Sequence, residues 1–191
     1  MDKNIRGTGE KRGVPLWAQI IIWAVLVGLL VVVAVSLNNS QQGSVQPGTH
    51  IQNFQVTLYS GYELNGKTTS DLASLNGKVV MINFWASWCK PCEQEAAALE
   101  QAWQFYQPGG QVAFIGADYV DTEPEARAYL QKFGITFANG PDLGTRLSQE
   151  FRIKGVPESY FLDQNGVLKY VQIGPFTSMD EIKAVIDPML Q

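Results

Sequence analysis

Histidine and cysteine are scarce in this 191-residue sequence: there is one histidine, His50, and there are two cysteines. A single histidine excludes most metal sites and any catalytic triad that needs a second one. Two cysteines cannot form the several bridges of a small disulfide-stabilised fold. Basic residues are outnumbered, because 14 Lys and Arg face 18 Asp and Glu, which gives a net charge of −4. Phosphate binding needs clustered Lys and Arg, so this acidic balance argues against nucleic acid as a partner.

Charged residues are absent from residues 16–37, which read LWAQIIIWAVLVGLLVVVAVSL. As a helix rising about 1.5 Å per residue, this segment would be about 33 Å long, enough to cross a hydrocarbon core of roughly 30 Å. A buried core helix would rarely be uncharged for so long, so the sequence predicts a single transmembrane anchor. A cleaved signal peptide is the alternative, since Ala34-Val35-Ser36 resembles a cleavage site. The apolar stretch is nevertheless longer than the roughly 7–15 residues of a signal h-region.

The charges that flank the apolar segment predict its orientation. The next charged residue after it is Glu63, and the basic residues before it are Lys3, Arg6, Lys11 and Arg12. By the positive-inside rule, residues 1–15 are expected in the cytoplasm and residues 38–191 outside it. An uncleaved anchor and a cleaved signal peptide would both export that larger part.

A short polar segment separates the anchor from the rest of the chain. Residues 38–48 read NNSQQGSVQPG, which is uncharged and has the composition of a flexible linker. Residues 49–191 are expected to form one domain, in which 10 Lys and Arg oppose 16 Asp and Glu. The chain as a whole is 46% hydrophobic, too apolar for disorder, and the domain is large enough to bury a core.

The hydrophobic pattern of the domain alternates between strand and helix periods. Lys78–Trp85 is almost continuously apolar, which is typical of a central strand covered on both faces. Asn165-Gly166 predicts a tight hairpin turn between two strands. The order predicts an α/β sandwich with parallel strands first, then an antiparallel hairpin and a closing helix. The expected strands are residues 52–58, 78–85, 111–117, 158–163 and 167–173. The expected helices are residues 70–75, 90–106, 143–151, one from the capping box Thr122-x-x-Glu125 to Phe133, and one from the capping box Ser178-x-x-Glu181 to a limit at Pro188.

Both cysteines lie at one strand-to-helix junction, in Trp85-Ala86-Ser87-Trp88-Cys89-Lys90-Pro91-Cys92. The free N–H groups and the positive dipole end of the helix should favour the thiolate of Cys89. Because the thiolate is the nucleophile in disulfide exchange, we expect Cys89 to be an accessible attacking sulfur. Cys92, one turn later, is expected to resolve the mixed disulfide. Lys90 adds positive charge beside the thiol, and Pro91 stiffens the first helical turn.

Two other roles for the cysteine pair are less favoured. A structural disulfide closing so short a loop would add little stability. A zinc site needs about four ligands, and the sequence offers no second pair of cysteines or histidines. The spacing therefore indicates redox chemistry, with no metal and no cofactor.

The run FWASWCKPC resembles the active-site segment of the thioredoxin superfamily, and the wider pattern resembles its membrane-anchored TlpA/ResA/CcmG group of cytochrome c maturation reductases. The likeness covers about residues 48–190 and includes Ser70-Asp71-Leu72 before Gly77-Lys78, and Gly155-Val156-Pro157-Glu158-Ser159 before a strand. It implies a thioredoxin-like α/β sandwich with an N-terminal hairpin extension, preceded by the single transmembrane helix.

The resemblance also implies roles for neighbours of the cysteines. Pro157 matches the cis-proline that faces the disulfide in the superfamily, where the backbone of the preceding residue, here Val156, pairs with bound substrate. Glu158 matches a Pro-Glu-Thr pattern in which Ser159 replaces threonine. Glu95 matches a glutamate of the ResA-like branch that helps proton transfer. Each glutamate could instead be a solvated surface carboxylate.

An aromatic residue, Trp88, and a polar residue, Asn83, complete the predicted site. Trp88, next to Cys89, is expected to pack at the rim and to form part of the docking surface. Cytosolic thioredoxins carry a buried aspartate where this chain has Asn83. An amide cannot accept the proton of Cys92, so the general base must be Glu95, Glu158 or water.

The implied function is an extracytoplasmic reductase that keeps the haem-binding cysteines of apocytochrome c reduced, with a membrane thiol carrier as electron donor. The chain is expected to be a monomer. Two alternatives stay open: a general reductase or oxidant of secreted protein disulfides, and a redox-inert assembly or binding module.

Overall fold

The structure is a computed structural model that describes residues 15–40 and 45–191. The chain divides into two units, residues 1–43 and 44–191. All four basic residues that precede the apolar segment lie outside the described residues, as do residues 41–44 of the expected linker. The orientation of the anchor therefore stays a prediction.

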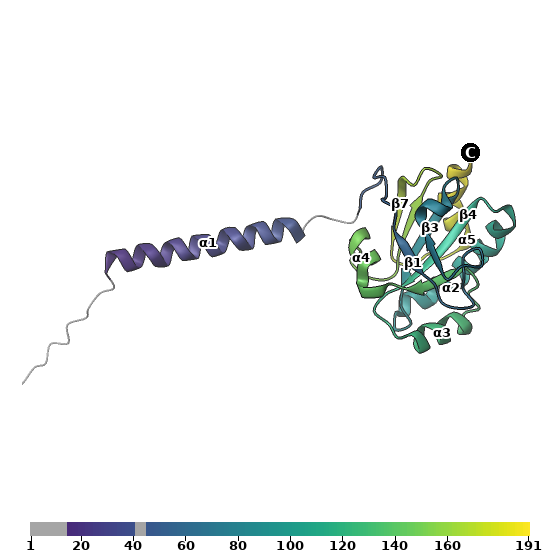
Figure 1. Cartoon of the computed structure of the whole chain (residues 1–191), viewed down its shortest axis with the longest axis horizontal. Helices are drawn as coiled ribbons and strands as arrows, with labels where there is room; N and C mark the ends of the chain where they lie inside the picture. Colours follow the sequence, from purple (N-terminus) through teal and green to yellow (C-terminus); the bar gives the residue numbers. More distant parts are fainter. Residues whose placement is uncertain (1–14, 41–44) are drawn as a thin grey trace, which may run out of the picture. The chain divides into compact units, whose positions relative to one another are not determined.

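The first unit is described as one long helix, α1 (Leu16–Ser40), shown in Figure 1. Its Leu16–Val35 stretch is apolar and long enough to cross a membrane, and none of that stretch is buried inside the protein. An apolar helix without a protein core around it fits a membrane anchor, so α1 is a candidate span by length and composition. The helix continues three residues beyond the predicted end at residue 37.

The second unit is built on a five-stranded sheet with strand order β5-β4-β3-β6-β7. The central strand β3 pairs in parallel with β4 and antiparallel with β6, while β5 runs parallel to β4 and β7 antiparallel to β6. All seven side chains of β3 are buried, as its continuous apolar sequence predicts. The strands are β3 (Val79–Trp85), β4 (Val112–Asp118), β5 (Ala138–Pro141), β6 (Glu158–Leu162) and β7 (Leu168–Ile173).

Helices cover both faces of this sheet (Figure 1). The two faces bury separate apolar clusters. Because side chains alternate along a strand, Met81 of β3 joins the cluster under the first face while Ile82 joins the opposite one. The first face is covered by α2 (Lys90–Tyr106), α3 (Glu123–Lys132) and α5 (Met179–Ile186). The opposite face is covered by β1 (Gln55–Thr57), the 3-10 helix Leu72–Leu75 and α4 (Arg146–Phe151).

The N-terminal extension differs from the sequence prediction in its boundaries. The strand expected over residues 52–58 is limited to β1, which pairs antiparallel with β2 (Thr69–Asp71). The helix expected from residue 70 begins only at Leu72, because Asp71 is its N-cap and its carboxylate accepts a hydrogen bond from Ser74 N–H. The implied hairpin extension is therefore present, with a strand where the first residues of a helix were expected.

Two further features differ from the sequence prediction. No strand was expected over residues 138–141, whose Asn-Gly-Pro sequence disfavours strands, but pairing with β4 at the sheet edge overrides that preference. Thr122 is the N-cap of α3 but its hydroxyl makes no capping bond to a backbone N–H; it donates to the Glu125 carboxylate at 2.8 Å instead.

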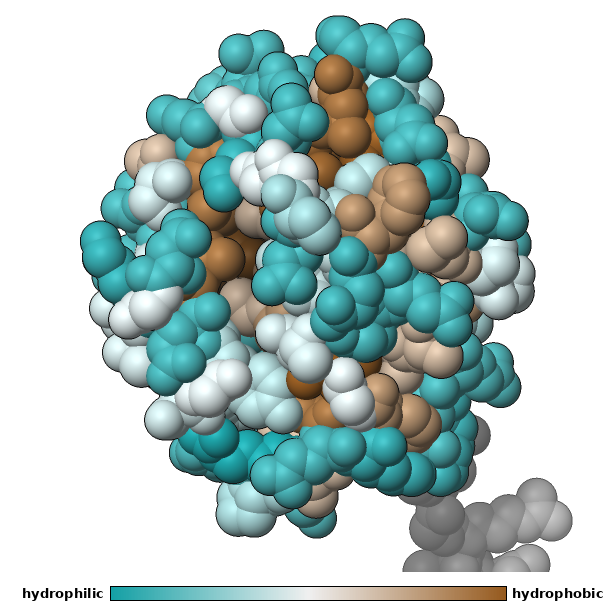
Figure 2. Space-filling model, turned by 90° about the vertical axis from the view of Figure 1, so that its right-hand side faces the viewer, coloured by the Kyte–Doolittle hydropathy of each residue, from teal (hydrophilic) through white to brown (hydrophobic). Residues whose placement is uncertain are grey.

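The other motifs form as predicted. Ser178 caps α5 by accepting from Glu181 N–H at 3.4 Å. Asn165 and Gly166 both have positive φ, 52° and 73°, which a two-residue hairpin turn of this kind requires. The parallel strands, the antiparallel hairpin and the closing helix follow in the predicted order. Figure 2 shows that one face of this unit is mainly hydrophilic, with hydrophobic residues in separate patches.

Gly140 of β5 tests how tightly the extension packs against the sheet. A Cβ atom at this position would lie 1.9 Å from the backbone carbonyl oxygen of Thr57 in β1. We expect Gly140→Ala to lower the free energy of unfolding by about 1–3 kcal/mol, because β1 must move away. Gly109→Ala is the matched control, since no atom lies within 4 Å of its added Cβ. Urea unfolding of both variants checks this, and equal stabilities would contradict the packing argument.

Candidate redox active site

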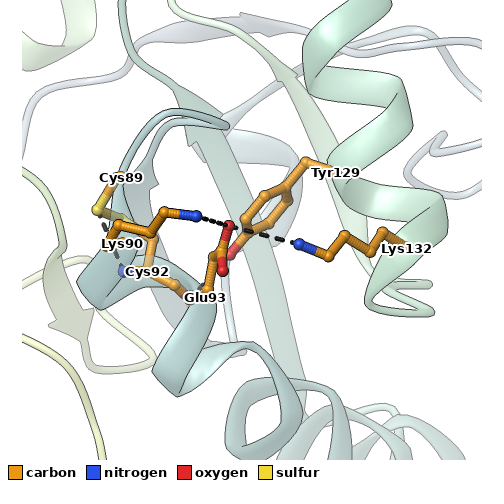
Figure 3. Close-up of polar contacts among 6 residues, drawn as sticks. All are labelled: Cys89, Lys90, Cys92, Glu93, Tyr129 and Lys132. Atoms are coloured by element: carbon orange, nitrogen blue, oxygen red, sulfur yellow. Dashed lines mark hydrogen bonds and ion pairs between the residues drawn. A yellow bond between two sulfur atoms is a disulfide. The ribbon is translucent and has the colours of Figure 1, made fainter.

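The two cysteines form a disulfide at the start of α2, with the sulfurs 2.04 Å apart (Figure 3). Cys89 is the N-cap of the helix, and its sulfur accepts a hydrogen bond from the backbone N–H of Cys92 at 3.1 Å. A donor aimed at this sulfur favours its thiolate when the pair is reduced. This is the electrostatic environment that the strand-to-helix position predicts for Cys89.

The disulfide is less accessible than the sequence analysis expects. Cys89 is 2% exposed and Cys92 is fully buried. Trp88, by contrast, is 57% exposed, and its indole N–H donates to the Val120 carbonyl at 3.1 Å. The exposed Trp88 beside the buried Cys89 fits the expected place of this side chain at the rim.

Lys90 does not direct its charge at the sulfurs. Its Nζ lies 3.0 Å from Glu93 Oε1, and Lys132 Nζ lies 3.5 Å from the same oxygen. Figure 3 shows the Lys90 side chain extending away from the disulfide toward Glu93. These pairs hold the pKa of Glu93 below its usual range, and the neighbouring carboxylate weakens the effect of Lys90 on the Cys89 thiolate.

Glu95 is a buried carboxyl, so the alternative interpretation of this residue as a solvated surface carboxylate is wrong. It is 1% exposed on the inner side of α2, one turn beyond Cys92. Asn83 Nδ2 donates to its Oε1 at 2.8 Å, and the backbone N–H of Phe176 donates to its Oε2 at 3.1 Å. Burial raises the pKa of Glu95 to about 7, although both hydrogen bonds act in the opposite direction. A carboxyl with this pKa can exchange a proton near neutral pH.

Asn83 orients that carboxyl. It is buried on β3, and its amide also donates to Ser159 Oγ of β6 at 2.9 Å. The amide therefore acts as a donor, in line with the expectation that it is not the base. Asn83 and Glu95 line a cavity of about 10 Å³ together with Tyr129, whose hydroxyl donates to the Cys92 carbonyl at 2.8 Å. This volume leaves room for little more than one water molecule.

The Val156–Pro157 peptide bond is cis, as the resemblance implies. Val156 is half-buried and packs against the cluster that contains both cysteines. Pro157 is buried, and its carbonyl accepts from Gly174 N–H at 3.0 Å. These two residues thus lie beside the apolar surroundings of the disulfide.

Glu158 is also buried, but it faces away from the cysteines. Its neighbour Ser159 points to Asn83 on the α2 side, so Glu158 points to the opposite face of the sheet. Its carboxylate accepts from Lys154 N–H at 2.8 Å, from Gly155 N–H at 3.2 Å and from Tyr160 OH at 2.7 Å. The structure therefore brings Glu95 to the side of the disulfide and ties Glu158 to the loop before Pro157.

One polar residue near the site was missed by the sequence analysis. Asp118 ends β4 directly opposite Trp85 of β3, is 3% exposed and accepts from Tyr59 OH at 2.7 Å. Burial, with a smaller contribution from the nearby Asp121, raises the pKa of Asp118 to about 7, although the hydrogen bond from Tyr59 acts in the opposite direction. An acidic residue immediately after an apolar strand was the available signal, since strand ends carry functional groups in α/β sheets.

Comparison with known proteins gives a consistent result. The model of the AhpC/TSA family matches residues 47–171. The chain is 32% identical over 133 residues to the thiol-disulfide oxidoreductase ResA of Bacillus cereus, covering 70% of this chain and 73% of that one. It is 34% identical over 124 residues to the thiol:disulfide interchange protein HelX of Rhodobacter capsulatus, covering 64% of this chain and 66% of that one.

A solved structure supports the fold. The thiol:disulfide interchange protein of the thioredoxin family from Chlorobium tepidum superposes with a TM-score of 0.66 at 24% identity, covering 78% of this chain and all of that chain. At this identity the likeness concerns the fold alone. The thioredoxin-like fold predicted from the sequence is confirmed.

The raised pKa of Glu95 predicts a specific pH dependence of stability. A carboxyl whose pKa is higher in the folded state than in the unfolded state makes the free energy of unfolding fall as the pH rises between the two values, here from 4.5 to about 7. Glu95→Gln removes this loss. The variant should therefore gain stability relative to the parent across that window, by up to about 3 kcal/mol above pH 7.

Urea unfolding of the oxidised protein at several pH values between 4 and 8.5, roughly the window in which this carboxyl titrates, measures this difference. Glu93→Gln is the control on the same helix, because the pKa of Glu93 is lowered and its removal should give no gain above pH 5, roughly its titration limit. A constant difference between Glu95→Gln and the parent at all pH values would contradict the assignment of a near-neutral pKa to Glu95.

Proposed function

We propose, from the premise that this chain belongs to the AhpC/TSA family and to its TlpA/ResA/CcmG group, that it is an extracytoplasmic thiol-disulfide reductase acting on apocytochrome c. As a thiol-disulfide oxidoreductase it uses the Cys89–Cys92 pair as its redox centre. The observation that carries the redox part of the proposal is the buried Glu95 carboxyl, which lies one helical turn from the buried Cys92 and whose pKa burial raises to about 7. A static structural disulfide has no need of a proton acceptor at this position.

In the first step, the thiolate of reduced Cys89 attacks one sulfur of the target disulfide. A bond forms between Cys89 and that sulfur, and the other target sulfur leaves as a thiolate, which takes a proton from water. The hydrogen bond from Cys92 N–H stabilises the attacking thiolate before the reaction.

In the second step, Cys92 resolves the mixed disulfide. The Glu95 carboxylate accepts the proton of the Cys92 thiol, and the resulting thiolate attacks the sulfur of Cys89. The target is released with both cysteines reduced, while the Cys89–Cys92 pair becomes the disulfide. Asn83 holds the carboxylate in place during this transfer through its bond to Oε1.

Substrate is expected to bind as an extended peptide across the exposed side of the site. The backbone of Val156, before cis-Pro157, would pair with it as an added strand. Trp88 offers an exposed aromatic surface next to Cys89. Glu158 supports this arrangement indirectly, because its carboxylate holds the two N–H groups of the loop that leads to Pro157.

The membrane part of the proposal rests on α1. With α1 as an uncleaved single-pass anchor and residues 1–15 in the cytoplasm, the domain of residues 49–191 would lie outside the cell membrane. Reducing equivalents must then cross the membrane, so a membrane thiol carrier is the proposed electron donor. The oxidised pair of cysteines in the haem-binding segment of apocytochrome c is the proposed acceptor.

Cys92→Ser should trap the target. This variant keeps the attacking sulfur but cannot resolve the mixed disulfide, so a covalent complex with an oxidised CxxCH peptide of apocytochrome c should accumulate. Non-reducing electrophoresis and mass spectrometry detect it. Cys89→Ser is the matched control and should trap nothing. Equal trapping of unrelated secreted proteins would favour a general reductase instead of the apocytochrome c reductase.

The reduction potential separates reductase from oxidant. We expect the purified full chain in detergent, equilibrated with glutathione buffers, to have a potential near that of thioredoxin, about −270 mV. A value near −120 mV, typical of a strong oxidant, would overturn the reductase proposal. A disulfide that dithiothreitol cannot reduce would support the redox-inert module.

A further inference from the structure

The turn of residues 119–121 binds residues 85–88, which directly precede the CxxC motif. Tyr119, Val120 and Asp121, between β4 and α3, each make one hydrogen bond to the segment of residues 85–88. Tyr119 N–H donates to the Trp85 carbonyl at 2.7 Å, at the last residue of β3. Three consecutive residues of one turn thus bind three of the four residues that precede Cys89.

The bond from Asp121 acts on the peptide group that also contacts Cys89. Asp121 Oδ2 accepts from Ser87 N–H at 2.6 Å, while the Ala86 carbonyl of the same peptide group accepts from Cys89 N–H at 3.1 Å. The peptide plane between Ala86 and Ser87 is therefore held on both sides. A charge-assisted bond to a carboxylate is stronger than a neutral one, so Asp121 is the firmer of the two partners.

Val120 has a backbone conformation that its side chain disfavours. Its φ is +48°, in the left-handed region that β-branched residues rarely adopt, and its side chain is 59% exposed. Such a conformation persists only where surrounding contacts fix it, and it is concentrated at functional sites. Here the Val120 carbonyl accepts the indole N–H of Trp88, the exposed residue next to Cys89.

We propose that Asp121 is a positioning residue for the redox centre, acting through Ser87 on the N-cap geometry of Cys89. The inference rests on the proposed function, because it assigns a positioning residue to the same cysteine pair. With the Ala86–Ser87 peptide fixed, Cys89 stays at the helix start where Cys92 N–H meets its sulfur. Loosening this peptide weakens that contact, which destabilises the thiolate and slows its attack.

The experiment compares Asp121→Ala with Asp121→Asn in the reduced full chain in detergent. Both variants remove the charge, but only asparagine keeps an oxygen that can accept from Ser87 N–H. Alkylation of Cys89 by iodoacetamide, followed over pH, reports its thiolate directly and needs no substrate docking. We expect Asp121→Ala to react roughly tenfold more slowly at pH 7 than Asp121→Asn, with a higher apparent pKa of Cys89.

Glu123→Ala is the matched control, because it removes a nearby exposed carboxylate that pairs with Arg127 and not with the segment of residues 85–88. It should react like the parent. Equal rates for Asp121→Ala and Asp121→Asn would overturn the proposal, and so would a lower melting temperature of Asp121→Ala without a change in the alkylation profile.

If circular dichroism shows that Asp121→Ala does not fold, Asp121→Leu replaces it, since leucine is close to asparagine in size but cannot accept from Ser87 N–H. An alkylation profile of that variant equal to the profile of Asp121→Asn would then overturn the proposal. Insulin reduction by the parent chain is measured separately. Its absence would count against the proposed function, whereas the variant comparison would still decide the role of Asp121.

Discussion

The contact between the Cys92 N–H and the sulfur of Cys89 is the interaction on which the site depends. It exists because only residues 86–89 separate the end of β3 from the start of α2, so that Cys89 takes the N-cap position where the helix has unpaired N–H groups. The stabilised sulfur and the exposed surface belong to two different residues. Cys89 is only 2% exposed in the oxidised protein, whereas its neighbour Trp88 is 57% exposed. The hydrogen bond at the start of α2 therefore acts on a sulfur that is itself buried.

A polar group also lies inside the apolar layer beside the cysteines. Among the described residues, Asn83 and the Phe176 N–H are the two donors that compensate the burial of Glu95 next to the cluster that contains both cysteines. These donors favour the carboxylate, yet desolvation outweighs them and leaves the pKa near 7. A third donor would lower the pKa and make the carboxylate a weaker base, whereas without donors the group would stay protonated at neutral pH. The charged form of this carboxyl therefore has a cost in stability above pH 7, roughly where the carboxyl becomes charged.

The sequence predicted the parts of this site that lie next to one another along the chain. The apolar period of β3, the amphipathic period of α2 and the CxxC spacing between them are local, and all three agree with the structure. The positions of Asn83 and Glu95 on one face follow from strand and helix periodicity, but their contact depends on how α2 packs. The turn at Asp121 and the strand β5 depend on contacts between segments far apart in the sequence. Asp121 accepts a hydrogen bond from Ser87, and β5 pairs with β4. Asn, Gly and Pro each have a low propensity for strands, so the local sequence of β5 gave no sign of a strand.

Alternation along β6 separates two tasks that the sequence placed side by side. Ser159 faces α2 and joins Asn83, which orients Glu95, while Glu158 faces the opposite layer and holds the loop that ends in cis-Pro157. A shift of one residue in the register of β6 against β3 would exchange these faces, placing a second buried carboxylate beside Glu95 and releasing the loop. Two carboxyls in that small space would raise each other's pKa and stop proton acceptance near pH 7. The pairing of Asn83 with Ser159 therefore determines which polar groups surround Glu95 on one face and which carboxylate holds the loop before cis-Pro157 on the other.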